Sequence, residues 1–297
     1  MNNSLKAGII SGLIAGFVLG IALEFFTQIA ISLGFYDPFY RQFVAGNLLF
    51  YIPLGIFWGV IYGIIYLKTY SLIPKKGILK GLIYGLFLYL ITTIRIYFYL
   101  IPYGLVQDAV GDFFSWFFIW IFYGLTLGFL YDFLSNRYYP IKEKKKIITY
   151  NISSGLLPGA IAGLCGGMAA SVVQVIGHVT GYWGVPVEGQ IISTIDFWMS
   201  QAGTHILINL IWGTIFGGLF AKVYNLVPGK KIKKGLYYGL IMVLITSFFI
   251  THWDIPRYAY LNEWGLALVI LLGQSTSFAN AIVFGLVLGL LYRKPSK

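Results

Sequence analysis

Eight apolar stretches divide the chain, and they restrict its fold more than any other feature. Each stretch is close to or above the roughly 20 residues that a helix needs to cross the ~30 Å hydrocarbon layer of a bilayer. Only 10% of the 297 residues are charged, which is too few to coat a soluble domain. We therefore expect an all-α, polytopic membrane protein with eight transmembrane helices at 7–34, 44–67, 77–101, 113–131, 155–182, 199–221, 235–250 and 264–292.

The two halves of the chain repeat one another. Residues 54–92 align without gaps on residues 208–246, and 19 of the 39 positions are identical. The last helices match at an offset of 161, and the first helices match at an offset of 151. We therefore expect two four-helix transmembrane repeats, 1–136 and 151–297, joined by a basic cytoplasmic linker over 137–150.

The distribution of charge predicts the orientation of the helices. If the N-terminus is cytoplasmic, eight crossings place 18 of the 21 basic residues inside and seven of the ten acidic residues outside. Cytoplasmic loops of membrane proteins carry such an excess of Lys and Arg. The prediction is a protein of the cell membrane with both termini in the cytoplasm and with two parallel repeats.

The net charge of +11 also bears on possible partners. A nucleic-acid-binding protein concentrates its positive charge on one soluble face. Here the charge is spread over five short cytoplasmic segments, so no nucleic-acid partner is expected. Membrane lipid is the partner that such segments contact, because they lie against an anionic surface.

Glycines recur every fourth residue in the first helix of each half. This spacing places them on one face of a helix, where a neighbouring backbone can approach closely. We expect these glycines to pack helices together, although a face of this kind can also border a conduit. At the offset of 151 the matched glycines are Gly8, Gly12 and Gly16 in the first half and Gly159, Gly163 and Gly167 in the second.

A set of short motifs occurs in both halves. A glycine-zipper helix is followed by W-G-x-x-x-G, by a P-x-K…K-G-x-x-Y-G-L hairpin and by G-x-x-x-G-x-x-Y. The pattern resembles small four-helix prokaryotic membrane proteins of unknown function, here in tandem duplication. The resemblance implies a duplicated unit and carries no activity with it.

Charged residues inside a membrane are expensive and therefore indicate a role. Glu24 and Arg95 lie at a similar depth in the first and third helices, by their distance from the nearest basic end, and we expect them to form an ion pair. The aligned positions of the second half are Val175 and Phe249. A static clamp between helices, side chains that reach toward the outer headgroups, and an ion- or proton-handling element all remain open.

The second half carries uncharged polar residues instead. Its sixth helix places Gln201, His205 and Asn209 at i, i+4 and i+8, which is one helix face. Its eighth helix carries Gln274, Thr276 and Asn280, and Asn47 is the amide of the first half that aligns with Gln201. These residues predict a polar pocket in the outer half of helices five to eight.

The sequence contains no pattern that predicts metal or cofactor binding. His178, His205 and His252 are the only histidines, and their spacing does not match that of metal-binding motifs. We expect no metal, haem or other cofactor; the less favoured alternative is a metal held by these three histidines or a haem held by two of them. No nucleophile and base occur in a recognisable arrangement, so the protein is not expected to be an enzyme.

Two functions fit these observations. The first is a small-solute or ion transporter or channel, built from the duplicated units and lined by the polar pocket. The second is a non-catalytic structural or accessory subunit of a larger membrane complex. A homo-oligomer or a larger complex is a possible assembly in either case. The convergence of Gln201, His205, Asn209 and Gln274 on one cavity would favour the first function.

Overall fold

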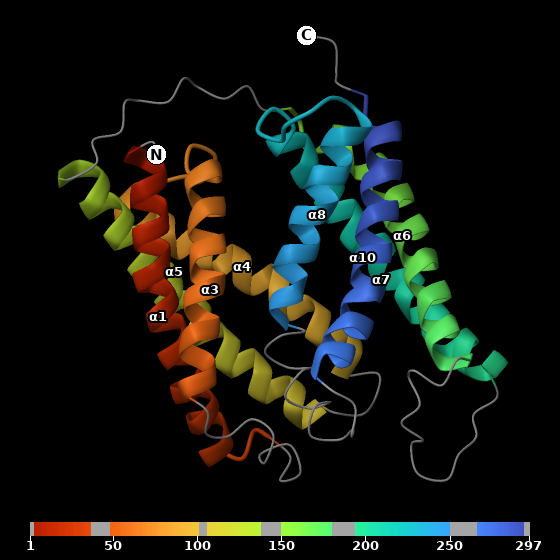
Figure 1. The fold of residues 1–297 in the computed structure, drawn as a ribbon, viewed down its shortest axis with the longest axis horizontal. Coiled ribbons are helices and arrows are strands. Elements are labelled where there is room, and N and C mark those ends of the chain that lie inside the picture. The colour runs from red at the N-terminus through yellow and green to blue at the C-terminus, as the bar shows by residue number, and fades with distance from the viewer. Residues whose placement is uncertain are drawn as a thin grey trace. The chain divides into compact units, whose positions relative to one another are not determined.

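The computed structural model describes residues 3–36, 48–100, 106–137, 150–179, 194–249 and 266–293. All regular secondary structure in these residues is α-helical, which confirms the predicted all-α class. The helices are α1 (Asn3–Ser32), α3 (Leu48–Thr69), α4 (Gly77–Leu100), α5 (Val106–Arg137), α6 (Ser153–Val179), α7 (Thr194–Val223), α8 (Ile232–Phe249) and α10 (Leu266–Leu291) (Figure 1).

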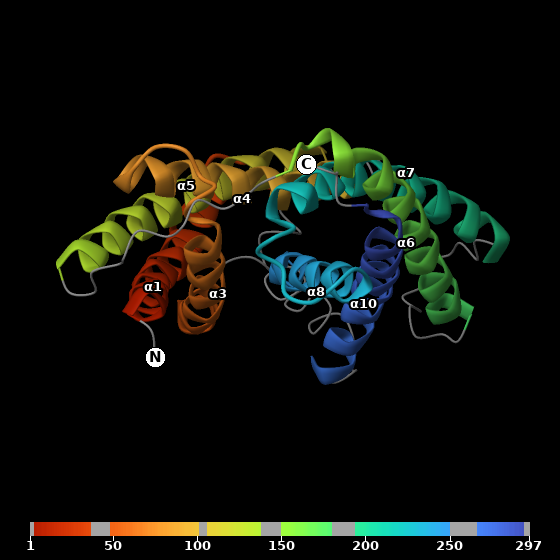
Figure 2. The ribbon, with the colours of Figure 1, turned by 90° about the horizontal axis from the view of Figure 1, so that it is seen from above.

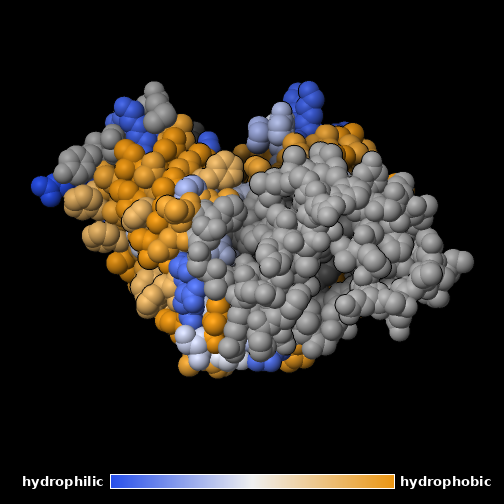
Figure 3. Space-filling view, turned by 60° about the horizontal axis from the view of Figure 1, so that its bottom comes forward, coloured by the Kyte–Doolittle hydropathy of each residue, from blue (hydrophilic) through white to orange (hydrophobic). Residues whose placement is uncertain are grey.

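Several helices are long and apolar enough to span a membrane. Within the described residues five helices meet this criterion, and they belong to α1, α3, α5, α6 and α7. The apolar helices Gly77–Thr93 and Ser275–Leu291, in α4 and α10, are shorter. The described surface in Figure 3 is largely hydrophobic, as lipid-facing helices require. A multi-pass helical membrane protein is thus supported, and the count of eight crossings stays a prediction.

The chain forms two compact units, Met1–Ile147 and Ile148–Lys297, here called unit 1 and unit 2. In unit 1, α1 packs against α3 and α5, and α5 packs against α4. In unit 2, α6 packs against α7 and α10, and α10 packs against α8 (Figure 2). The order of packing is therefore the same in the two units, and the units divide inside the segment expected as a linker.

Glycines hold the first two helices of each unit together. A Cβ atom at Gly12 would lie 2.6 Å from the carbonyl oxygen of Gly59, and one at Gly16 would lie 2.5 Å from that of Gly55. No side chain fits between backbones this close, so α1 and α3 touch directly. In unit 2 the same direct contact joins α6 and α7 through Gly155, Gly159, Gly163, Gly213 and Gly217.

These contacts correct the alignment of the first helices. Gly63 of α3 contacts Gly8 and Gly12, whereas its counterpart in α7, Gly217, contacts Gly155 and Gly159. The matching offset is therefore 147 and not 151, a difference of about one helical turn. At this offset all four glycines of α1, at positions 8, 12, 16 and 20, match those at positions 155, 159, 163 and 167. Glu24 consequently matches Ser171 and not Val175.

The repeated lysine of each hairpin binds the end of the preceding helix. Lys80 Nζ donates to the carbonyl oxygen of Tyr70 at 2.8 Å and lies 3.7 Å from the centre of the Tyr70 ring. Lys234 Nζ donates to the carbonyl oxygens of Tyr224 and Val227. The last carbonyls of a helix lack partners within it, and a lysine ammonium can satisfy them.

The repeated tyrosine of each hairpin ties the third helix of a unit to the second. Tyr84 Oη donates to the carbonyl oxygen of Tyr62 at 2.9 Å, and Tyr238 Oη donates to that of Phe216 at 2.8 Å. The lysine and the tyrosine are four residues apart, so they lie on one helix face. The K-G-x-x-Y motif thus fastens two helices at two successive turns.

Candidate functional site

Two asparagines of unit 2 meet between three helices. Asn280 Nδ2, on α10, donates to Asn209 Oδ1, on α7, at 2.5 Å. Gly166 of α6 makes this possible, because a Cβ atom there would collide with the Asn280 side chain. Gly163, one turn earlier on α6, contacts the backbone carbonyl of Asn209. Two glycines of α6 therefore leave the space that the amide pair occupies.

The amide pair lies deep within the apolar helices. Asn209 precedes Lys222 by 13 residues, and Asn280 precedes Arg293 by 13 residues. At 1.5 Å per residue each amide is about 20 Å from the basic end of its helix. Both side chains are half-buried. An amide at this depth is costly unless it is hydrogen-bonded, and the pair satisfies one group of each partner.

Thr276 adds a hydroxyl one turn away from Asn280 on the same face of α10. Its side chain is about nine-tenths buried, with 9% exposed. Among the residues that the structure describes, its hydroxyl has no hydrogen-bond partner. The matched residue of unit 1 is Ser115, whose hydroxyl donates to the carbonyl oxygen of Phe26 at 3.3 Å. A buried hydroxyl without a protein partner indicates a place for a bound water, ion or solute.

The structure describes the side chains of only three of the seven residues expected in the pocket. The structure joins Asn209 to Asn280 and places Thr276 on the same helix face as Asn280. The side chains of Gln201, His205 and Gln274, and the whole of Asn47, lie outside the described residues. Their convergence on one cavity stays a prediction.

The three histidines also lie outside the part of the chain whose side chains are described. They are His178, His205 and His252. In the part that is described, no group of three or more His, Cys, Asp or Glu side chains could hold a metal ion.

Glu24 accepts a hydrogen bond from a residue of its own helix. Gln28 Nε2, one turn along α1, donates to Glu24 Oε1 at 3.0 Å. The side chain of Arg95 lies outside the described residues, so the Glu24–Arg95 ion pair stays a prediction. The revised alignment adds that unit 2 has a hydroxyl, Ser171, at the position of this carboxylate.

Sequence analysis missed a buried carboxylate in unit 1. Asp112 is fully buried near the start of α5, where Tyr36 Oη donates to its Oδ1 at 2.9 Å. The Ser115 hydroxyl lies 3.4 Å from Tyr36 Oη. A Cβ atom at Gly111 would lie 2.8 Å from the Tyr36 ring, so the glycine lets the ring approach. The sequence signal is Gly-Asp followed by Ser three residues later, and the charge distribution alone places Asp112 among the seven acidic residues expected outside.

The ring beneath the hairpin lysine of unit 1 is electrically neutral. Burial and, to a smaller extent, the charge of Asp132 raise the pKa of the Tyr70 phenol. The phenol therefore stays protonated at neutral pH. An ammonium above a neutral aromatic ring is a favourable cation–π contact.

No known protein family, curated protein or solved structure matches the chain. The resemblance to small glycine-zipper proteins stays a prediction, and the case for a function depends on the residues of the chain itself.

Proposed function

We propose that the protein is a membrane transporter or channel in which Asn209, Thr276 and Asn280 of unit 2 bind a small polar solute or ion. The observation that carries the proposal is the buried Thr276 hydroxyl without a described partner, one turn from an amide pair deep in the membrane. Polar groups at such depth are rare and mark solute or ion paths.

The comparison with unit 1 supports the same assignment. Asn280 matches Ile119, and Gly166 matches Leu19. Ile119 and Leu19 are fully buried, so unit 1 closes this region with apolar bulk. Unit 2 replaces that bulk with an amide and a glycine. A change of this kind weakens packing, and a role of these residues in solute binding would explain it.

The chemistry of the three side chains limits the solute. Two amides and a hydroxyl offer both donors and acceptors but carry no charge. They suit a neutral hydrogen-bonding solute or a monovalent cation held by oxygen atoms. A multivalent ion would need carboxylates, and none of these three residues supplies one.

Two four-helix units in tandem fit this function. Matched glycine contacts, lysine caps and tyrosine bonds recur in both units, as an origin by duplication would predict. Parallel duplicated units, with both termini cytoplasmic, are one of the plans on which transporters are built. The proposal includes this plan, with eight crossings and both ends inside the cell.

Flux into reconstituted vesicles tests the proposal. The solutes are Na⁺, K⁺, Cl⁻ and glycerol. Asn280→Leu should reduce flux of the accepted solute by at least about tenfold, equivalent to about 1.4 kcal/mol of lost interaction. Thr276→Val keeps the shape of the side chain and should reduce flux less.

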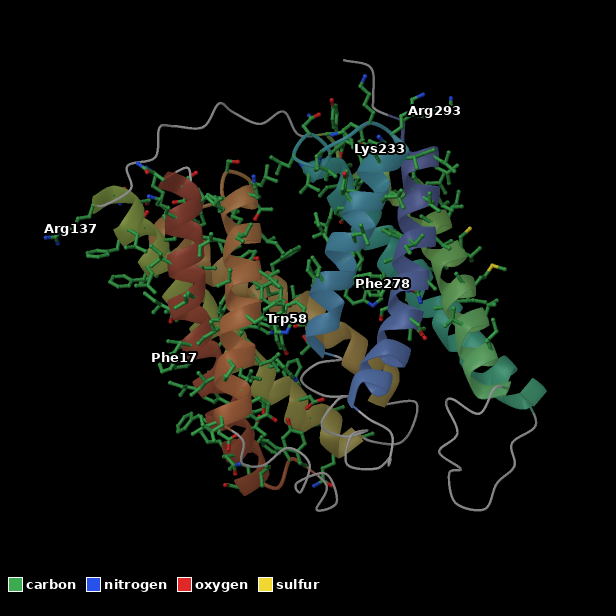
Figure 4. The ribbon with its side chains drawn as sticks, viewed as in Figure 1. Phe17, Trp58, Arg137, Lys233, Phe278 and Arg293 are labelled. Atoms are coloured by element: carbon green, nitrogen blue, oxygen red, sulfur yellow. The ribbon has the colours of Figure 1, made fainter. Side chains whose placement is uncertain are left out.

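Phe278→Leu is the matched control, because Phe278 lies between the two residues on α10 but is 42% exposed (Figure 4). Its flux should equal that of the unmodified protein. Equal flux in all three variants would remove the site. An inactive unmodified protein that carries a stoichiometric protein partner in native mass spectrometry would favour an accessory subunit instead.

A further inference from the structure

The basic ends of the two units differ in charge at several matched positions, and at one of them, Asp132 in unit 1 and Arg293 in unit 2, the sign is reversed. In unit 1, Gly128 of α5 packs against Gly77, and the Asp132 carboxylate lies 3.5 Å from where a Cβ atom of Gly77 would be. In unit 2, Gly289 of α10 packs against Lys231 in the same manner. Arg293 follows Gly289 by four residues, as Asp132 follows Gly128. An arginine thus replaces an aspartate beside the hairpin.

This replacement leaves unit 2 with a cluster of positive charge. Lys230, Lys231, Lys233 and Arg293 are all exposed. Lys233 and Arg293 lie at the same end of unit 2 (Figure 4). The sequence has no Asp or Glu in residues 197–253 or 264–297. Like charges at one end of a helix bundle repel each other, so an anion from outside the chain would stabilise this end.

Unit 1 has an acidic side chain near the lysines of its hairpin. Lys75 and Lys76 are exposed at its hairpin, and the Asp132 carboxylate lies next to Gly77, the residue that follows them. An internal carboxylate therefore offsets part of the positive charge, and the need for an external anion is smaller.

Apolar side chains adjoin the cluster of unit 2. Ile232 is 37% exposed, Leu290 is 62% exposed and Leu291 is 41% exposed. Arg and Lys side chains bind phosphate through charge-assisted hydrogen bonds. A ligand that carries both a phosphate and apolar chains would satisfy both surfaces.

We propose that the basic end of unit 2 holds the phosphate of an anionic phospholipid, and that the matching end of unit 1 does not. The site depends on membrane insertion but not on the proposed transport. Its failure would therefore leave the solute site untouched.

A charge exchange between the two ends tests the proposal. Arg293→Asp gives unit 2 the acidic side chain that unit 1 has at the matched position, and Asp132→Arg does the reverse. The probes are phosphatidylglycerol and phosphatidylcholine, each titrated into the full-length protein in detergent. Native mass spectrometry then counts the lipids that each variant retains.

The expected results follow from the charges. Arg293→Asp should weaken phosphatidylglycerol retention by at least about tenfold, equivalent to about 1.4 kcal/mol. Asp132→Arg should allow a second phosphatidylglycerol to be retained. Phosphatidylcholine, which has no net charge, should respond to neither change. Unchanged retention in Arg293→Asp would overturn the proposal.

Two further variants and a competing anion sharpen the test. Lys233→Gln alters an exposed side chain and should also weaken retention, so the proposal can be judged even if Arg293→Asp fails to fold. Lys76→Gln in unit 1 is the control and should have no effect. Inorganic phosphate should neither displace the lipid nor raise the melting temperature; if it does both, the ligand is free phosphate and the lipid assignment is wrong.

Discussion

The interior side chains of the two units differ more than their shared frame does, by which we mean the glycine contacts between helices and the hydrogen bonds of the hairpins. In unit 1, Trp120 is fully buried, and its match in unit 2 is Ala281. Trp116 of unit 1 is likewise buried and matches Ser277. The helix seams and hairpin bonds, by contrast, recur in both. Backbone contacts through glycine hold the frame, so the interior side chains can change without loss of the helix arrangement.

Polar groups have also moved to different depths. Tyr123, one helical turn after Ile119 on α5, donates its Oη to the carbonyl oxygen of Gly59 at 3.0 Å, whereas its match in unit 2 is Phe284. In the middle of the helices unit 1 has Ile119 where unit 2 has Asn280. Unit 1 thus has a hydroxyl bonded to a backbone carbonyl here, and unit 2 has two amides bonded to each other.

The largest expected effect concerns the shared frame. Gly213→Val places a branched side chain where Gly159 and Gly163 of α6 touch α7. The helices must separate, so the free energy of unfolding should fall by about 3 kcal/mol, at the upper end of overpacking penalties. Gly59→Val should do the same in unit 1. Thermal unfolding in detergent measures both.

Gly203→Ala is the control for the glycine contacts, because no atom of the described residues lies within 4 Å of the Cβ position at Gly203. It should be neutral or stabilising by up to about 1 kcal/mol, since alanine favours the helix. Equal losses at Gly203 and Gly213 would show that helix propensity, and not close contact, accounts for the glycines.

The next effect concerns Asp112, the buried carboxylate of unit 1. Asp112→Ala removes the acceptor of the Tyr36 hydroxyl and should lower the free energy of unfolding by about 2 kcal/mol, because a buried polar group loses its partner. Tyr36→Phe should cost less. In a double-mutant cycle the two losses should be less than additive. Strict additivity would mean that the observed bond contributes nothing.

The hairpin lysines of the two units differ in the number of carbonyl oxygens that they bind. Lys234 binds two carbonyl oxygens and Lys80 binds one. Lys234→Met should therefore lower the free energy of unfolding by about 2 kcal/mol and Lys80→Met by about 1 kcal/mol. Lys76→Met, at an exposed hairpin position, should change little. A larger loss at Lys80 would contradict the count of hydrogen bonds.

Much of this frame could be predicted from the sequence. Long apolar stretches indicated helices, and glycines four residues apart indicated close packing. The register of the first helices could not be fixed, because a glycine pattern with a period of four matches itself after a shift of one turn. Contacts with Gly63 and Gly217 were needed to choose the offset of 147.

The site was harder to predict than the frame. The sequence identified Asn209, Thr276 and Asn280 as polar residues in apolar helices, but not the asparagine bond across Gly166. Asp112 was overlooked for a related reason. Its position near a helix end resembles that of an exposed acid, and only the approach of Tyr36, 76 residues away in the chain, buries it.

The smallest expected effect is one that should be equal in the two units. Tyr84→Phe and Tyr238→Phe each remove one hydroxyl that donates to a backbone carbonyl of the second helix. Each change should lower the free energy of unfolding by about 1 kcal/mol, because the carbonyl keeps its bond within the helix. Urea or thermal unfolding of the two variants measures the losses side by side. If the losses differ by more than about 1 kcal/mol, the two tyrosine contacts are not equivalent. The conclusion that the two units share a frame would then be wrong for the contact in which they look most alike. Equal losses would locate the divergence of the units in their interiors, where Asn280 has replaced Ile119.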